Sequence, residues 1–197
     1  MKSRAGLLYA DLLLLLTAAI WGFAFVAQRV GMEDIGPFAF NAVRYAIGVL
    51  ILLPLIRYRK GKAPGARPSA AGAATTPGGF WGRSIPFVLT GGAMFIGASL
   101  QQLGIVTTTA GNAAFVTSLY VVIIPLLASL FGRKTSFKDY AAALISVLGL
   151  YIITVGFGSG FSIASGDLLV LAGSLFWAIH ILVIGKFAST VDPVELS

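Results

Sequence analysis

Polar side chains with hydrogen-bonding chemistry recur inside the most apolar segments of this chain. The stretch TTTAGNAAFVTSLYVVIIPLL, residues 107–127, opens on three threonines, a glycine and an asparagine, and carries Thr117 and Tyr120 further along. Polar groups inside a membrane are costly and usually face a bundle interior or a watery cavity. We therefore predict that this segment faces protein and cavity, with little exposure to lipid. Its Pro125 frees a backbone carbonyl and is expected to kink the helix.

Aromatic and amide side chains form two candidate ligand-binding faces. Trp21, Phe25 and Gln28 follow the spacing i, i+4 and i+7, so they share one face of a helix. Trp177 and His180 form a similar face near the end of the chain. Both faces are open to helix packing or to ligand contact. His180, the only histidine, could bond to a neighbouring helix, bind substrate or exchange protons.

A second kind of chemistry comes from an arginine in an apolar segment. Arg44 has Asn41 one turn before it and Tyr45 beside it. An arginine that faces a central cavity would bind an anionic or carboxylate-bearing substrate. Snorkelling to the membrane interface and pairing with backbone carbonyls are the alternatives.

We predict one set of residues as contacts for a small-molecule substrate. These residues are Trp21, Phe25, Gln28, Asn41, Arg44, Gln101, Asn112, Thr117, Tyr120, Trp177 and His180. Asp11 and Asp167 each lie at the start of an apolar segment, where a carboxylate caps a helix. Asn112 also suits a helix start, with Thr109 or Gly111 as the alternative cap.

No catalytic or cofactor chemistry accompanies these residues. The sequence has no cysteine and a single histidine, so it offers neither a metal cluster nor a nucleophile paired with its base. It also has no G-x-x-x-x-G-K phosphate loop. We therefore expect no cofactor, no metal and no enzymatic activity.

The composition indicates that most of the chain is surrounded by lipid. Of the 197 residues, 57% are hydrophobic and 11% are charged, whereas soluble domains carry about 25% charged residues. We therefore predict an all-α polytopic membrane helix bundle in the lipid bilayer. Six segments suit spans of about 20 residues: Leu7–Val30, Pro37–Ile56, Ile85–Leu103, Gly111–Phe131, Tyr140–Phe157 and Asp167–Phe187.

Positive charge alternates between the connections. Gly31–Gly36, Gly104–Ala110 and Gly158–Gly166 are almost free of lysine and arginine, whereas the N-terminus and the other connections are basic. This predicts a cytoplasmic N-terminus. Residues 61–79 read as a flexible cytoplasmic linker. The net charge of +7 lies in loops and span ends, with no groove-reading helix or stacking platform, so we expect no nucleic-acid binding.

Two segments of the chain align without a gap. Asp11, Trp21 and Pro37 of residues 10–37 match Asp167, Trp177 and Pro193 of residues 166–193. The offset contains five predicted spans, so the second copy would be inverted in the membrane. Inverted repeats are typical of secondary transporters. We predict a five-span repeat over 1–157 and an incomplete second repeat over 158–197, truncated after its first span.

Three segments give the chain a family resemblance. They are IWGFAFVAQRVG with GPFAFNAVRYAIG (20–48), LGIVTTTAGNAAFVTSLYVVIIPLL (103–127) and GDLLVLAGSLFWAIHIL (166–182). The sequence resembles EamA-type members of the drug/metabolite transporter superfamily. The resemblance implies ten spans in two inverted halves, cytoplasmic termini and movement of small metabolites, often by export. This chain departs from the pattern by lacking spans seven to ten.

The expected function is a secondary carrier that moves a small metabolite or drug-like solute out across the plasma membrane by alternating access. In a bacterium this is the inner membrane. A non-transporting membrane scaffold or an inactive partial chain is the alternative. Assembly as a homodimer is also open.

Overall fold

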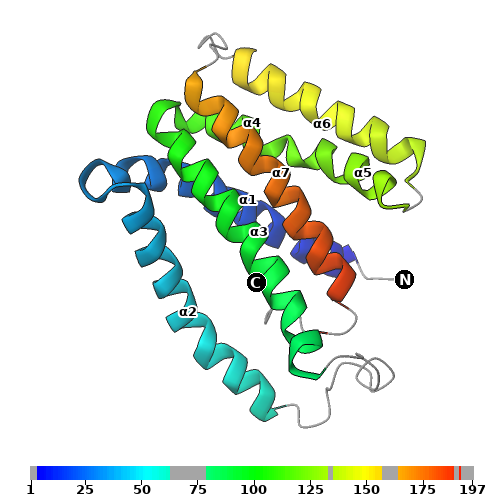
Figure 1. Ribbon diagram of the computed structural model, residues 1–197. Coiled ribbons are helices and arrows are strands. Elements are labelled where there is room, and N and C mark those ends of the chain that lie inside the picture. Colours follow the sequence, from blue (N-terminus) through cyan, green and yellow to red (C-terminus); the bar gives the residue numbers. More distant parts are fainter. Residues whose placement is uncertain (1–3, 63–78, 133–134, 157–163, 189–190, 192–197) are drawn as a thin grey trace.

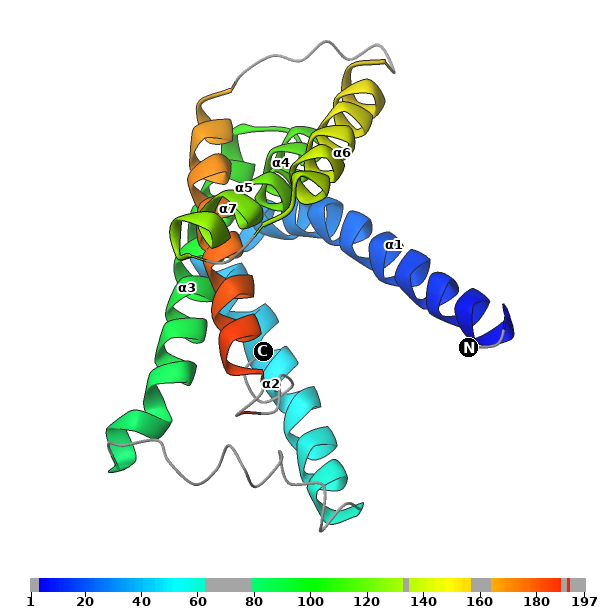
Figure 2. The same cartoon turned by 90° about the vertical axis from the view of Figure 1, so that its right-hand side faces the viewer.

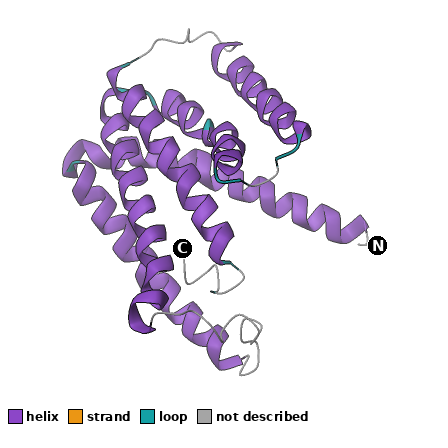
Figure 3. Cartoon of the chain, turned by 45° about the vertical axis from the view of Figure 1, so that its right-hand side comes forward, coloured by secondary structure: helices purple, strands orange, loops and turns teal. Residues whose placement is uncertain are grey.

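The computed structural model describes residues 4–62, 79–132, 135–156, 164–188 and 191. In these ranges every regular element is a helix, as Figures 1 and 3 show. The helices are α1 (Arg4–Ile35), α2 (Pro37–Lys62), α3 (Gly79–Thr107), α4 (Ala110–Ser118), α5 (Tyr120–Leu130), α6 (Phe137–Gly156) and α7 (Ser165–Phe187). The predicted all-α bundle is confirmed.

Five helical segments of the described residues are long and apolar enough to cross a membrane. They are Gly6–Ile35, Pro37–Tyr58, Ser84–Thr107, Ala110–Leu130 and Ser165–Phe187. The remaining predicted span, Tyr140–Phe157, is helical as α6 but is not one of these five, and Phe157 lies outside the described residues. Most of the predicted linker, residues 63–78, also lies outside them.

The first connection is shorter than the sequence predicted. Residues 31–35 continue α1, so Gly36 alone joins it to α2. Gly36 adopts a φ of 64°, which a residue with a side chain rarely adopts, and its N–H donates to the Met32 carbonyl at 3.3 Å. Pro37 then begins α2, where its missing N–H costs no hydrogen bond. The prediction of a loop over Gly31–Gly36 was therefore wrong.

The two aspartates that the sequence predicted as caps behave differently. Asp167 lies in the first turn of α7, where its Oδ2 accepts the Ala164 N–H at 2.7 Å. Asp11 lies inside α1, which is already helical from Arg4. Only the first turn of a helix has unpaired backbone N–H groups, and Asp11 lies past that turn. The capping prediction for Asp11 was therefore wrong.

The span after α3 is broken, but not at its proline. Thr109 caps α4, since its Oγ1 accepts the Asn112 N–H at 3.0 Å. The helix is interrupted at Leu119, whose N–H donates to the Val116 carbonyl at 3.2 Å in a tighter turn. Pro125 lies within α5. The discontinuity therefore lies upstream of the predicted kink, before the carbonyl of Val121 that the proline leaves unpaired.

Helices α3 and α7 lie side by side and are the most closely packed pair of helices (Figure 1). Glycines allow the close approach. A Cβ on Gly104 would lie 2.6 Å from the Gly166 carbonyl oxygen, and a Cβ on Gly173 would lie 2.9 Å from the Gly97 carbonyl oxygen. Small residues let membrane helices bring their backbones together. If α7 begins a second repeat, as the sequence predicts, this pair would join the two repeats.

Burial of α1 and α2 is confined to one end of the bundle. We call it the hairpin end, and it contains Gly36, the Thr108–Thr109 connection and Ala164. The buried residues of α1 and α2 are Gln28, Met32 and Asn41, all close to Gly36. Beyond them both helices expose leucine, isoleucine and valine and diverge from the other helices, as Figure 2 shows. Apolar side chains on such surfaces suit contact with lipid.

Candidate functional site

Helix α3 is the element on which polar residues from the other helices converge. Asn41 of α2 donates from Nδ2 to the Ala98 carbonyl at 3.3 Å. Gln101 donates from Nε2 to Thr117 Oγ1 of α4 at 2.8 Å. All four of these residues are buried. The predicted residues Asn41, Gln101 and Thr117 thus meet α3 within about one turn of each other.

Two more helices contact the same turn and a half. Gln102 donates from Nε2 to the Met32 Sδ of α1 at 2.7 Å. A Cβ on Gly97 would lie 3.5 Å from the Trp177 backbone nitrogen of α7. Residues 97–102, which we call the α3 hub, are therefore contacted by α1, α2, α4 and α7. The hub is about 8 Å long at 1.5 Å per residue.

Three buried amides, on α1, α2 and α3, keep an unpaired oxygen. The Gln28, Asn41 and Gln102 side chains are at most 7% exposed. Each NH2 group donates to an acceptor, which for Gln28 is the Ala24 carbonyl at 3.1 Å. This fixes the orientation of each amide, because an oxygen at that position would face another acceptor. Gln28 Oε1, Asn41 Oδ1 and Gln102 Oε1 therefore remain free to accept N–H or O–H donors.

Two buried donors are also unpaired. Arg44 donates from Nη2 to Tyr45 Oη at 2.9 Å, and its guanidinium lies 4.8 Å from the Tyr45 ring centroid and 5.9 Å from that of Phe40. Its Nε has no partner, and neither has Nε1 of Trp177. Arg44 is thus partly buried on aromatic rings of its own helix and keeps an N–H that suits an anionic oxygen.

His180 bonds to a neighbouring helix, one of the three roles the sequence left open. Its Nδ1 lies 3.0 Å from the Thr90 carbonyl of α3, so Nδ1 carries the proton in this contact. The ring also meets Trp177 edge-on, with centroids 5.8 Å apart at 86°. The His180 contact lies beyond the hub, because Thr90 precedes Ala98 by about two turns of α3.

The other predicted site residues lie further from the hub. Trp21 is 56% exposed on α1, whereas Phe25 is partly buried against the apolar core. Asn112 lies in the first turn of α4, and Tyr120 begins α5 beyond the break at Leu119. These four residues therefore do not form one cluster with the hub.

Arg29 was absent from the predicted set, yet it makes the most interhelical hydrogen bonds of any side chain in the described ranges. Its Nη1 donates to the α3 carbonyls of Ile105 and Val106, the latter at 2.7 Å, and to the Thr108 carbonyl at 3.0 Å. A cation stabilises the negative C-terminal end of a helix. The sequence signal was an arginine beside a connection otherwise free of positive charge.

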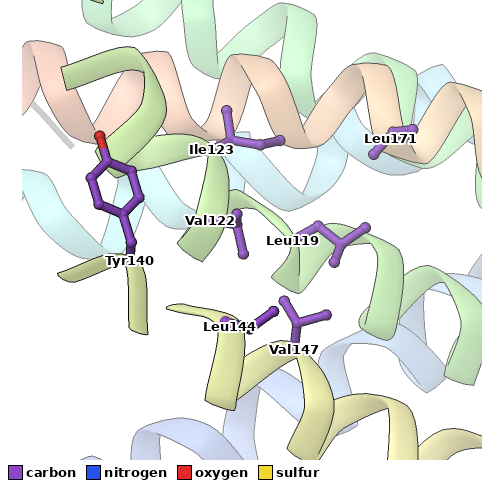
Figure 4. Close-up of a pocket in the computed structure, with 7 residues that line it drawn as sticks. All are labelled: Leu119, Val122, Ile123, Tyr140, Leu144, Val147 and Leu171. Atoms are coloured by element: carbon purple, nitrogen blue, oxygen red, sulfur yellow. The ribbon is translucent and has the colours of Figure 1, made fainter. Parts of the chain in front are cut away.

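Two pockets differ in chemistry. A polar one of about 280 Å3 at the hairpin end is lined by Arg29, Val106, Thr107, Thr108, Thr109, Asn112 and Ala164. An apolar one of about 450 Å3, drawn in Figure 4, lies between α5, α6 and α7 and is lined by Leu119, Val122, Ile123, Tyr140, Leu144, Val147 and Leu171. Among the described residues no three His, Cys, Asp or Glu side chains gather as metal ligands.

Comparisons with known proteins agree with this architecture. The chain is 35% identical over 191 residues to an "Uncharacterized transporter" of Archaeoglobus fulgidus, covering 96% of this chain and 53% of that protein. It is 26% identical over 159 residues to the "Uncharacterized inner membrane transporter YedA" of Escherichia coli strain K12, covering 81% and 47%. The chain thus spans about half the length of these curated relatives. No solved structure matches it.

A family model provides the assignment. The model of the EamA-like transporter family matches residues 8–155, which include most of α1, all of α2 to α5 and nearly all of α6. The match covers the α3 hub and the hydrogen bonds that α1, α2 and α4 make to it. The chain is therefore a multi-pass membrane protein that belongs to the EamA-like transporter family.

Proposed function

We propose that this chain is a secondary carrier that exports a small solute by alternating access. The observation that carries the proposal is the convergence of α1, α2, α4 and α7 on the α3 hub, where the buried amide oxygens of Asn41 and Gln102 lack partners. Polar groups are retained inside a membrane mainly for helix contact or function. An amide whose NH2 bonds to a helix can hold that helix, and its free oxygen can still bind a solute.

The free groups suggest the chemistry of the solute. The amide oxygens of Gln28, Asn41 and Gln102 accept hydrogen bonds, whereas the Arg44 Nε and Trp177 Nε1 donate them. A small molecule with both N–H groups and a carboxylate would complement this set. We propose that such a solute binds beside the hub.

The membrane arrangement follows from the charges. We propose that the N-terminus is cytoplasmic in the plasma membrane, which places the hairpin end outside. Residues 1–157 then form the first inverted repeat and residues 158–197 begin the second. The α3–α7 contact through glycines supports this division, because it joins one helix from each repeat.

Counterflow in proteoliposomes tests the function. Liposomes containing the chain and an unlabelled solute inside are diluted into the radiolabelled solute, using a panel of amino acids, organic anions and aromatic amines. A carrier that alternates between two states accumulates label transiently, whereas protein-free liposomes do not. If no member of the panel accumulates although the protein is folded in the liposomes, the scaffold or inactive-chain alternative is favoured. The oligomeric state is measured in the same sample, because a homodimer remains a prediction.

A further inference from the structure

We propose that Arg29, Thr108 and Asp167 form a clasp that keeps the hairpin end closed while the opposite end is open. They are positioning residues, and none belongs to the predicted substrate set. The inference rests on the proposed carrier function, because a gate has meaning only for a protein that alternates between two open ends.

Thr108 makes hydrogen bonds to a helix of each predicted repeat. Its Oγ1 donates to Asp167 Oδ1 of α7 at 2.5 Å, and its carbonyl accepts from Arg29 Nη1 of α1 at 3.0 Å. Thr108 is 4% exposed and Asp167 is 5% exposed. One residue in the connection between α3 and α4 therefore ties α1 of the first repeat to α7 of the second.

The clasp adjoins the buried apolar core. The buried cluster of Met32, Ile105, Ala113, Phe115, Val116 and Val170 contains residues of α1, α3, α4 and α7. Ile105 and Ala113 flank the Thr108–Thr109 connection in sequence and are completely buried. The Arg29 Nη1 also donates to the Ile105 carbonyl, which joins the clasp to this core.

At the opposite end α3 and α7 stay joined by the contact between His180 Nδ1 and the Thr90 carbonyl at 3.0 Å, whereas α1 and α2 leave the bundle. The described side chains of α1 from Gly6 to Gly22 are all exposed, and α2 is buried only at Asn41. Figure 2 shows these two helices leaving the bundle away from the hairpin end. The bonds that Arg29 and Thr108 donate, the latter to Asp167, thus join α1 to α7 at the end where α1 and α2 are buried, and the proposal takes the other end as the open one.

A cysteine reporter tests the clasp without requiring transport, since the sequence has no native cysteine. Ala113→Cys places a thiol in the core beneath the clasp, where Ala113 is 0% exposed. The full chain is reconstituted in nanodiscs, so that a polar thiol reagent reaches both faces. Thr108→Val removes the hydroxyl, and Thr108→Ser keeps it. Arg29→Met removes the guanidinium at similar length.

We expect Thr108→Val and Arg29→Met to speed labelling of the Ala113→Cys reporter by about tenfold, because each removes a hydrogen bond to a charged group. Thr108→Ser should label at the parental rate. A second reporter, Ala93→Cys, lies in α3 away from the hairpin end and should be unaffected. Unchanged labelling at Ala113→Cys, or an equal rise at both reporters, would overturn the clasp. Because no solute is present, either result is independent of counterflow.

Discussion

Replacing Gly104 by alanine is expected to destabilise the bundle by about 1–3 kcal/mol, the usual cost of overpacking. The new Cβ would lie 2.6 Å from the Gly166 carbonyl oxygen and 3.0 Å from the Val170 backbone nitrogen. Both neighbours are backbone atoms of α7, so they cannot rotate away as a side chain would. The helices must separate instead, which also loosens the rest of the α3–α7 contact.

Gly92→Ala is the matched control on the same helix. No atom outside the local helix lies within 4 Å of a Cβ at Gly92. Alanine is favoured over glycine in a helix interior by about 1 kcal/mol, so this variant should be neutral or slightly more stable. Equilibrium unfolding of the full chain in detergent micelles measures both variants. Equal stability of Gly104→Ala and Gly92→Ala would contradict the close α3–α7 contact.

Arg44→Gln is expected to lower counterflow of the transported solute by about ten- to a hundredfold, if that solute carries a carboxylate. Hydrogen bonds to charged groups are worth about 1.5–3 kcal/mol, and the variant loses the cation that we propose binds the carboxylate. Neutral solutes of the same size should be affected far less. Rates are measured in proteoliposomes at several solute concentrations.

Thr17→Val is the control for this experiment. Its hydroxyl is exposed on α1 and donates only to the Leu13 carbonyl of the same helix, at 2.8 Å. It should transport like the parent chain. Equal counterflow rates of Arg44→Gln and Thr17→Val for a carboxylate solute would contradict the prediction. Arg44 would then serve only to stack on Tyr45 and Phe40.

Features determined by local sequence were predicted well. The cap by Thr109 was one of the alternatives for the start of α4, and Asp167 caps α7, because a cap depends on residues within one turn. The prediction failed for Asp11, since α1 already begins at Arg4 and its first turn therefore ends before Asp11. The same kind of extension turned residues 31–35 from a loop into helix.

Features determined by distant contacts were only partly predictable. The sequence predicted Gln101 and Thr117 as polar site residues, because both lie in apolar segments. It did not predict that they bond to each other. Arg29 was missed because its acceptors are backbone carbonyls of Ile105, Val106 and Thr108, which no side-chain pattern marks. The break at Leu119 also follows from packing, since the nearby Pro125 alone predicted a different place.

Substrate protection of a hub cysteine tests whether a transported solute binds beside the α3 hub. A single reporter, Ala98→Cys, lies in the hub at a residue that is 1% exposed and whose carbonyl accepts from Asn41. Labelling by a small thiol reagent is measured with and without a solute that shows counterflow. A solute at ten times its Kd should slow labelling about tenfold, while an Ala10→Cys reporter, exposed on α1, keeps its rate. Equal labelling of Ala98→Cys in both conditions, or equal slowing at both reporters, would contradict the account.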